Sequence, residues 1–176
     1  MNLFKKIICF LKPFEPPFEK TEFEKFEDAL LNFQIFYPKH WSYEKETAVI
    51  DGAYAIIFHS TTSPASLRIE VNTKIPKCYS KKDFRKYAKN EIEKPTAGVI
   101  ANAKEQRINN YECIQTEYFF YDRGRKFYGK KIFIFVKDRI FSLFFICDEE
   151  NHKNLKKTFD YIVDSLVIKP KKLIIV

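Results

Sequence analysis

The sequence is poor in the residues and motifs that catalysis most often needs. It contains three histidines, four glycines and one tryptophan in 176 residues. It has no glycine-rich motif for nucleotide phosphates, no His-Glu-x-x-His zinc motif and no Gly-x-Ser-x-Gly turn of the hydrolases. A nucleophilic triad would need His40, His59 or His152, and each is better explained as a structural or solvent-facing residue. The sequence therefore predicts a protein that is not an enzyme and uses no cofactor.

Cysteine is also scarce, and its placement does not suggest a metal site. The four cysteines are Cys9, Cys78, Cys113 and Cys147. They form no Cys-x-x-Cys pair, and no histidine lies at metal-ligand spacing from any of them. Cys113 and Cys147 lie within apolar runs, which is typical of small core residues. This cysteine usage favours a reduced, cytoplasmic setting.

Positive charge exceeds negative charge. Lys and Arg number 31 against 23 acidic residues, which gives a net charge of +8 and a pI of about 9.2. Such a balance can attract nucleic acid, an anionic membrane or an acidic protein, and it can also be an ordinary solvated surface. Since no nucleic-acid-binding motif accompanies the charge, nucleic acid is the least favoured of these partners.

The first 20 residues have the pattern of a basic amphipathic segment followed by a stiff linker. Apolar residues at helical spacing share one side, and lysines fall on the other: Leu3, Phe4, Ile7, Ile8 and Leu11 against Lys5, Lys6 and Lys12. The apolar run 7–11 is too short to cross a bilayer, and "PFEPPF" reads as a linker. The segment can dock on protein or lie on an anionic membrane at its inner face, and the sequence leaves both open. We expect residues 21–176 to form a single domain.

Strand-like and helix-like patterns alternate through this domain. A Thr-x-x-Glu capping box predicts a short helix over 21–30, and helices are also expected after Ser80 and over 155–166. Strands are predicted at 33–37, 47–50, 54–60, 65–73, 99–107, 111–121, 131–136 and 140–147, with "LIIV" as a short edge strand. Many antiparallel strands with one middle helix and one late helix predict an α+β sandwich.

Two stretches, "FQIFYPKHW" and "DYIVDSLVI", carry a resemblance to a known family. The residues concerned are Phe33, Ile35, Tyr37, Pro38, Trp41, Phe159, Ile162, Val163, Ser165 and Leu166. With the elements between them, residues 33–168 resemble the PsbP-like family, although His40 replaces the family's usual glycine before the tryptophan. The resemblance implies an α-β-α sandwich around a central antiparallel sheet. Relatives include the PsbP subunit of photosystem II, a yeast Ran-binding factor and bacterial effector-chaperone adaptors, which implies protein binding without catalysis.

A patch of basic and aromatic residues in "DRGRKFYGKK" is the strongest candidate binding site. Its members are Arg123, Arg125, Lys126, Phe127, Tyr128 and Lys130. This combination can contact an acidic protein surface, grip phosphates and stack on bases, or form a solvated hairpin loop. We therefore expect a non-catalytic protein-binding or adaptor domain. The alternatives are a peripheral membrane protein anchored by its N-terminal segment, and a small-ligand-binding protein or hydrolase.

Overall fold

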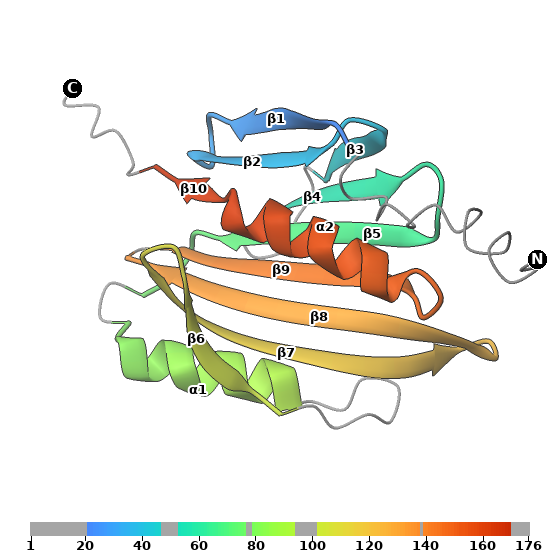
Figure 1. Cartoon of the computed structure of the whole chain (residues 1–176). Helices are drawn as coiled ribbons and strands as arrows, with labels where there is room; N and C mark the ends of the chain where they lie inside the picture. Colours follow the sequence, from blue (N-terminus) through green and yellow to red (C-terminus); the bar gives the residue numbers. More distant parts are fainter. Residues whose placement is uncertain (1–20, 47–52, 77–78, 94–101, 138, 170–176) are drawn as a thin grey trace, which may run out of the picture.

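Two antiparallel sheets and two helices make up the part of the chain that the structure describes (Figure 1). The structure is a computed structural model, and it describes residues 21–46, 53–76, 79–93, 102–137 and 139–169. Seven strands form the main sheet, in the order β3-β4-β5-β9-β8-β7-β6, and three form a small sheet, in the order β1-β2-β10. The main-sheet strands are β3 (Trp41–Glu46), β4 (Ala53–Ser60), β5 (Ala65–Asn72), β6 (Lys104–Ile108), β7 (Tyr111–Asp122), β8 (Arg125–Val136) and β9 (Arg139–Asp148). The other elements are β1 (Phe23–Asp28), β2 (Phe33–Pro38), β10 (Val167–Ile168), α1 (Lys81–Glu93) and α2 (His152–Asp164).

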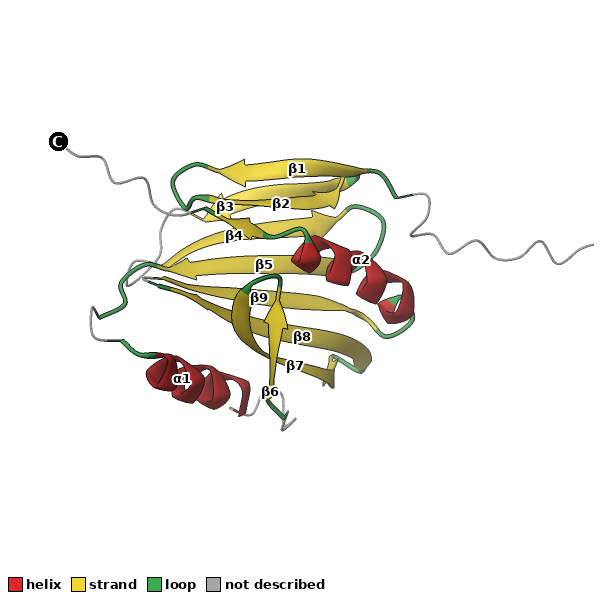
Figure 2. Cartoon of the chain, turned by 60° about the vertical axis from the view of Figure 1, so that its left-hand side comes forward, coloured by secondary structure: helices red, strands yellow, loops and turns green. Residues whose placement is uncertain are grey.

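The elements form three layers, with α1 on one face of the main sheet and α2 with the small sheet on the other (Figures 1 and 2). The predicted α+β sandwich around a central antiparallel sheet is therefore confirmed. No helix in the part of the chain that the structure describes is long and apolar enough to cross a membrane.

The central strands follow the alternation of their sequences. In β5, Leu67, Ile69 and Val71 are fully buried on the α2 side, and the residues between them are half-buried on the α1 side. In β9, side chains toward both faces are buried along the first half of the strand, as its continuous apolar sequence predicts. The main sheet is thus covered on both faces at its centre.

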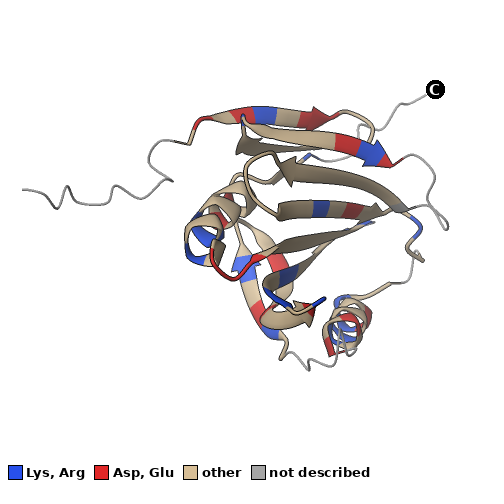
Figure 3. Ribbon diagram, turned by 90° about the vertical axis from the view of Figure 1, so that its right-hand side faces the viewer, with Lys and Arg blue, Asp and Glu red and all other residues tan. Residues whose placement is uncertain are grey.

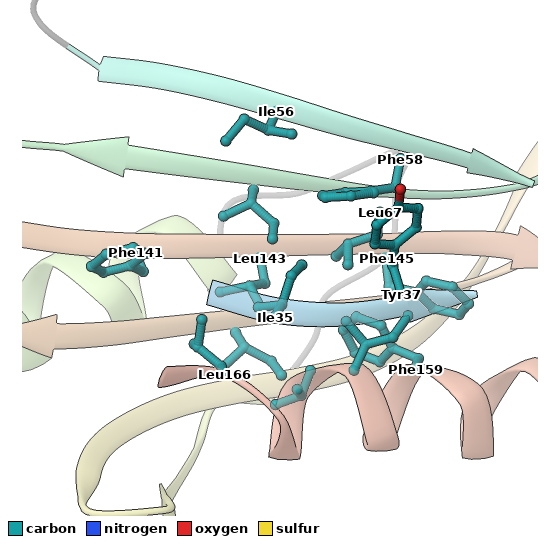
Figure 4. Close-up of a cluster of buried hydrophobic side chains, with 14 of the residues drawn as sticks. Ile35, Tyr37, Ile56, Phe58, Leu67, Phe141, Leu143, Phe145, Phe159 and Leu166 are labelled. Atoms are coloured by element: carbon teal, nitrogen blue, oxygen red, sulfur yellow. The ribbon is translucent and has the colours of Figure 1, made fainter. Parts of the chain in front are cut away.

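The larger core lies between α2, the small sheet and the main sheet (Figure 4). Phe159 of α2 stacks on Phe145 of β9 with ring centroids 4.4 Å apart, and Phe33 of β2 meets Phe141 edge-on at 5.7 Å. Ile162 and Leu166 complete the buried side of the helical segment, at the positions that the helical spacing predicts.

The smaller core lies under α1. Its helix begins after Ser80, whose hydroxyl accepts a hydrogen bond from the N–H of Asp83 at 3.2 Å. The Asp83 carboxylate accepts one in return from the N–H of Ser80 at 2.9 Å, so the predicted start signal forms a reciprocal cap. Phe84, Ala88 and Ile92 then face the sheet and are buried.

The predicted helix over residues 21–30 is wrong, because β1 is a strand. It pairs antiparallel with β2, with Phe26 opposite Ile35. Phe26 and Asp28 are buried, whereas Leu30, which the helical spacing placed on the buried side, is 72% exposed. Cross-strand pairing therefore overrides the local capping pattern.

Other predicted strands differ at their ends. The strand at 47–50, its Asp51-Gly52 turn and the final "LIIV" lie outside the described residues. The strand beside β4 is instead β3, which starts at Trp41 directly after the strand-ending Pro38 corner. Trp41 is 4% exposed, and its indole N–H has no hydrogen-bond partner among the described atoms.

Candidate protein-binding surface

The β7–β8 hairpin carries the predicted patch on two different faces. The strands pair from Cys113 opposite Ile134 out to Asp122 opposite Arg125. β9 pairs with β8 only as far as Phe127, so the last residues project beyond their neighbour (Figure 1). Apart from Arg123, which lies in the turn, the patch is thus part of β8, and its alternate residues point to opposite sides.

The side of the hairpin that faces α2 is buried and its charges are paired. The Lys130 ammonium is 2.7 Å from an Asp160 oxygen and 3.6 Å from a Glu117 oxygen, and the lysine side chain is 7% exposed. Tyr128 is 2% exposed, and burial raises the pKa of its hydroxyl. Tyr128 and Lys130 are therefore interior residues, and the prediction that they form part of an accessible binding patch is corrected.

Lys126 lies between the interior and the tip. Its ammonium is 2.5 Å from a Glu149 oxygen and 4.8 Å from the centre of the Phe119 ring. The hydrogen bond to Glu149 raises the pKa of Lys126. This lysine is charged, half-buried and already paired within the domain.

The hairpin tip, which we define as residues Tyr121 to Lys126, presents unpaired positive charge. Arg123 and Arg125 are exposed, and neither makes an ion pair with any described residue. Arg123 and Gly124 adopt left-handed conformations, with φ of 47° and 78°, which matches a tight two-residue hairpin turn. Tyr121 beside them is 66% exposed. The turn therefore holds two arginines and a tyrosine in a defined arrangement.

The opposite side of the hairpin carries half-buried aromatic rings. Phe127 stacks on Phe120, with centroids 5.5 Å apart and planes 22° apart, and Tyr118 is 5.8 Å from Phe120. Gly129 lies directly opposite Tyr118, and the tyrosine ring occupies the space that a side chain at 129 would fill. A glycine in mid-strand is explained by this close approach.

A groove of about 520 Å³ adjoins the hairpin tip. Its described lining is Pro64, Gly124, Arg125, Lys126, Phe127, Asp148, Glu149 and Glu150. Basic and acidic side chains both line this groove, which suits a polar contact more than an apolar ligand.

The histidines form no catalytic arrangement with the residues that the structure describes. His59 Nε2 lies 3.3 Å from Glu44, and both side chains are exposed. His40 lines a pocket of about 250 Å³ with Trp41, hydroxyl groups and asparagines, and the described lining contains no acid or cysteine. Within the described ranges there is also no cluster of three metal-ligating side chains.

Sequence reasoning missed two aromatic residues of the hairpin. Phe119 and Tyr121 are 38% and 66% exposed, and their alternation with Tyr118 and Phe120 along β7 could have identified them. The other predicted contact residues are Leu3, Phe4, Ile7, Ile8 and Leu11. All five lie outside the described residues.

Comparison with known proteins supports the fold and not an activity. No family model and no curated protein sequence matches the chain. Among solved structures, cyanobacterial PsbP (CyanoP) from Synechocystis sp. PCC 6803 is similar with a TM-score of 0.63 and 13% identity, over 85% of this chain and 94% of that one. LpqN of Mycobacterium tuberculosis, involved in cell envelope biogenesis, is similar with a TM-score of 0.58 and 10% identity, over 86% of this chain and 94% of LpqN. The Ran-binding protein Mog1p of Saccharomyces cerevisiae is similar with a TM-score of 0.55 and 9% identity, over 84% of this chain and 96% of Mog1p.

These neighbours confirm the predicted resemblance at the level of the fold. Each is covered almost completely, so the similarity includes the whole sandwich and not one motif. At identities of 9–13%, the likeness concerns the fold alone.

Proposed function

We propose that this chain, which has the PsbP-like fold, binds another protein without catalysing a reaction on it. The observation that carries the proposal is the hairpin tip, where Arg123 and Arg125 are exposed without an ion pair among the described residues. Lys126 and Lys130 of the hairpin already have acidic partners in the domain. On the hairpin, the two unpaired arginines are therefore more available to a partner than these lysines.

The composition of the tip suits a protein interface. Arginine and tyrosine are enriched among the residues that contribute most to protein binding, and a turn fixed in a left-handed conformation loses little entropy on binding. An acidic surface on the partner would complement Arg123 and Arg125. The similarity to a Ran-binding protein supports protein binding in general but not this partner.

Charge over the rest of the surface is mixed. In the described residues, basic and acidic side chains are interspersed along the strands and both helices (Figure 3). This distribution favours a local protein contact over a continuous nucleic-acid track. The proposed setting is the cytoplasm, supported by Cys113 and Cys147, which are buried free thiols.

Affinity capture with the full chain tests this function. We expect R123A/R125A to lose specific partners from a lysate of the native host while its thermal unfolding midpoint is unchanged, because both side chains are exposed. The control is K82A/K86A on α1, which removes the same charge from exposed lysines without an ion pair to any described residue. Recovery of the same proteins by wild type and by R123A/R125A would refute the proposal.

A further inference from the structure

The face of the main sheet that carries α1 is only partly covered. α1 packs against β7 and β8 near one end of these strands, where Ile114 and Phe133 are buried. Farther along the strands the side chains on this face are half-buried, and no helix in the described ranges lies over them (Figure 1). We call this region the open sheet face: Ile57, Tyr118, Phe120, Phe127 and Ile146.

Four of these side chains form a continuous strip across β9, β8 and β7, and Ile57 lies apart from them, beyond Arg68 of β5. Ile146 of β9 lies opposite Gly129 of β8, and Gly129 lies opposite Tyr118 of β7. Because Gly129 has no side chain, the Tyr118 ring extends over it: a Cβ at 129 would be 2.6 Å from Tyr118 Cζ. Phe120 and Phe127 continue the strip toward the hairpin tip. Crossing from β9 to β7, the strip is about 10 Å wide, since neighbouring strands lie about 4.8 Å apart.

The sequence outside the described residues predicts a matching apolar surface. The spacing of residues 3–11 predicts a helix of about 13.5 Å with Leu3, Phe4, Ile7, Ile8 and Leu11 on one side. This length is sufficient to cross the strip from β9 to β7. The lysines of the segment fall on the other side, so docking through the apolar side would bury none of them. On the sheet, the Lys131 ammonium already lies against the Tyr118 ring, 5.5 Å from its centre.

The point of attachment brings this segment within reach of the open sheet face. Thr21, the first described residue, lines a pocket with Ser63. The next residue, Pro64, lines the groove that includes Phe127 of the open sheet face. The proline-rich linker 13–20 has eight residues and can span about 25 Å when extended. A short tether also gives the segment an effective concentration on the order of millimolar, which favours this site over one on another molecule.

We propose that the apolar side of residues 3–11 docks on the open sheet face of the same chain. The docked segment covers Tyr118, Phe120 and Phe127, whose side chains are otherwise partly exposed to solvent. Because Phe127 shares its groove with Arg125, the segment then lies next to the hairpin tip. The docking requires no partner protein, so an experiment that refutes the docking does not refute the proposed function, and the reverse also holds.

Methyl NMR of the full chain, labelled at the isoleucine δ1 groups, tests the docking. Ile57 and Ile146 report on the open sheet face, and Ile7 and Ile8 report on the segment. We expect nuclear Overhauser cross-peaks between a segment methyl and Ile146. Leu11→Asp should abolish them and shift the Ile146 signal, because it places a charge on the apolar side, at its end next to the linker.

The control variant is Lys6→Asp, which introduces the same carboxylate on the opposite side of the predicted helix and should leave the cross-peaks in place. Identical spectra for wild type and Leu11→Asp at Ile57 and Ile146 would overturn the proposal. Cross-peaks seen only between differently labelled chains would also overturn it, because they identify a second copy as the occupant. Segment signals that respond to phosphatidylserine vesicles, with no contact to Ile146 in buffer, would assign the segment to a membrane instead.

Discussion

Gly129→Ala should destabilise the protein through a single contact. A Cβ at this position would lie 2.6 Å from Cζ and 2.9 Å from the hydroxyl oxygen of Tyr118. Carbon atoms in favourable contact are about 3.5–4.0 Å apart, so the ring would have to move by roughly 1 Å. Overpacking of this kind costs about 1–3 kcal/mol, whereas alanine relieves about 0.5–1 kcal/mol of the entropy cost of glycine in a strand. We expect a net loss of about 0.5–2 kcal/mol in the free energy of unfolding.

The sign of this effect should depend on Tyr118. In a Tyr118→Ala background the ring is gone, so Gly129→Ala should be neutral or stabilise the protein by about 0.5–1 kcal/mol. Urea unfolding followed by the fluorescence of Trp41, the only tryptophan and 4% exposed, measures all four proteins. The coupling free energy from this cycle should be about 1 kcal/mol or more.

A second glycine provides the control. Gly124 has φ of +78°, and a Cβ there would meet no atom within 4 Å. Gly124→Ala should cost about 1–2 kcal/mol through backbone strain alone, by the same amount with or without the Tyr118 ring. If Gly129→Ala has equal effects in both backgrounds, the close approach of the ring is not the reason for glycine in this strand.

Three further changes test other parts of the fold. Burial alone would raise the pKa of Asp28, but its hydrogen bonds, chiefly from Lys45, hold the pKa below the ordinary value. The ionised Asp28 carboxylate therefore stabilises the fold at pH values above its unfolded pKa of about 3.9, and this contribution is lost as the pH falls through its lower folded pKa. In urea unfolding, the free energy of unfolding of Asp28→Asn should therefore decrease less steeply below about pH 4 than that of wild type. Arg139→Met removes two hydrogen bonds to backbone carbonyls and should cost about 3 kcal/mol or more in urea unfolding, and a loss below about 1 kcal/mol would contradict this. Burial raises the pKa of Cys113 to about 11 and that of Cys147 to about 12, so peptide mapping should find both thiols unalkylated by iodoacetamide at pH 8 until the protein is unfolded.

Local patterns were sufficient to predict the fold wherever burial follows a single period. The alternation of β5 and the helical spacing of Phe159 and Ile162 each match the observed buried side. β1 was mistaken for a helix because Phe23, Phe26 and Leu30 follow a capping box at helical spacing, and only the pairing with β2 makes these residues a strand. Such pairing is not visible in a local window.

The candidate site could be predicted only in part, for a similar reason. The sequence identified Arg123 and Arg125 at a turn, and the structure places both at the tip. It did not identify the partner of Lys130, because Asp160 is 30 residues away and becomes its neighbour only through the packing of α2 on the sheet. A lysine beside aromatic residues therefore looked accessible although it is buried.

The small sheet has a consequence for how the chain folds during synthesis. The backbone N–H of Phe36 donates to the hydroxyl of Ser165, 129 residues later in the chain, and β10 pairs with β2 only two residues beyond that serine. At a translation rate of about 5–20 residues per second, the edge of β2 waits roughly 6–26 s on the ribosome for its neighbour. At the opposite edge of this sheet, the exposed charges of Lys25 and Glu27 discourage pairing of other nascent chains with β1.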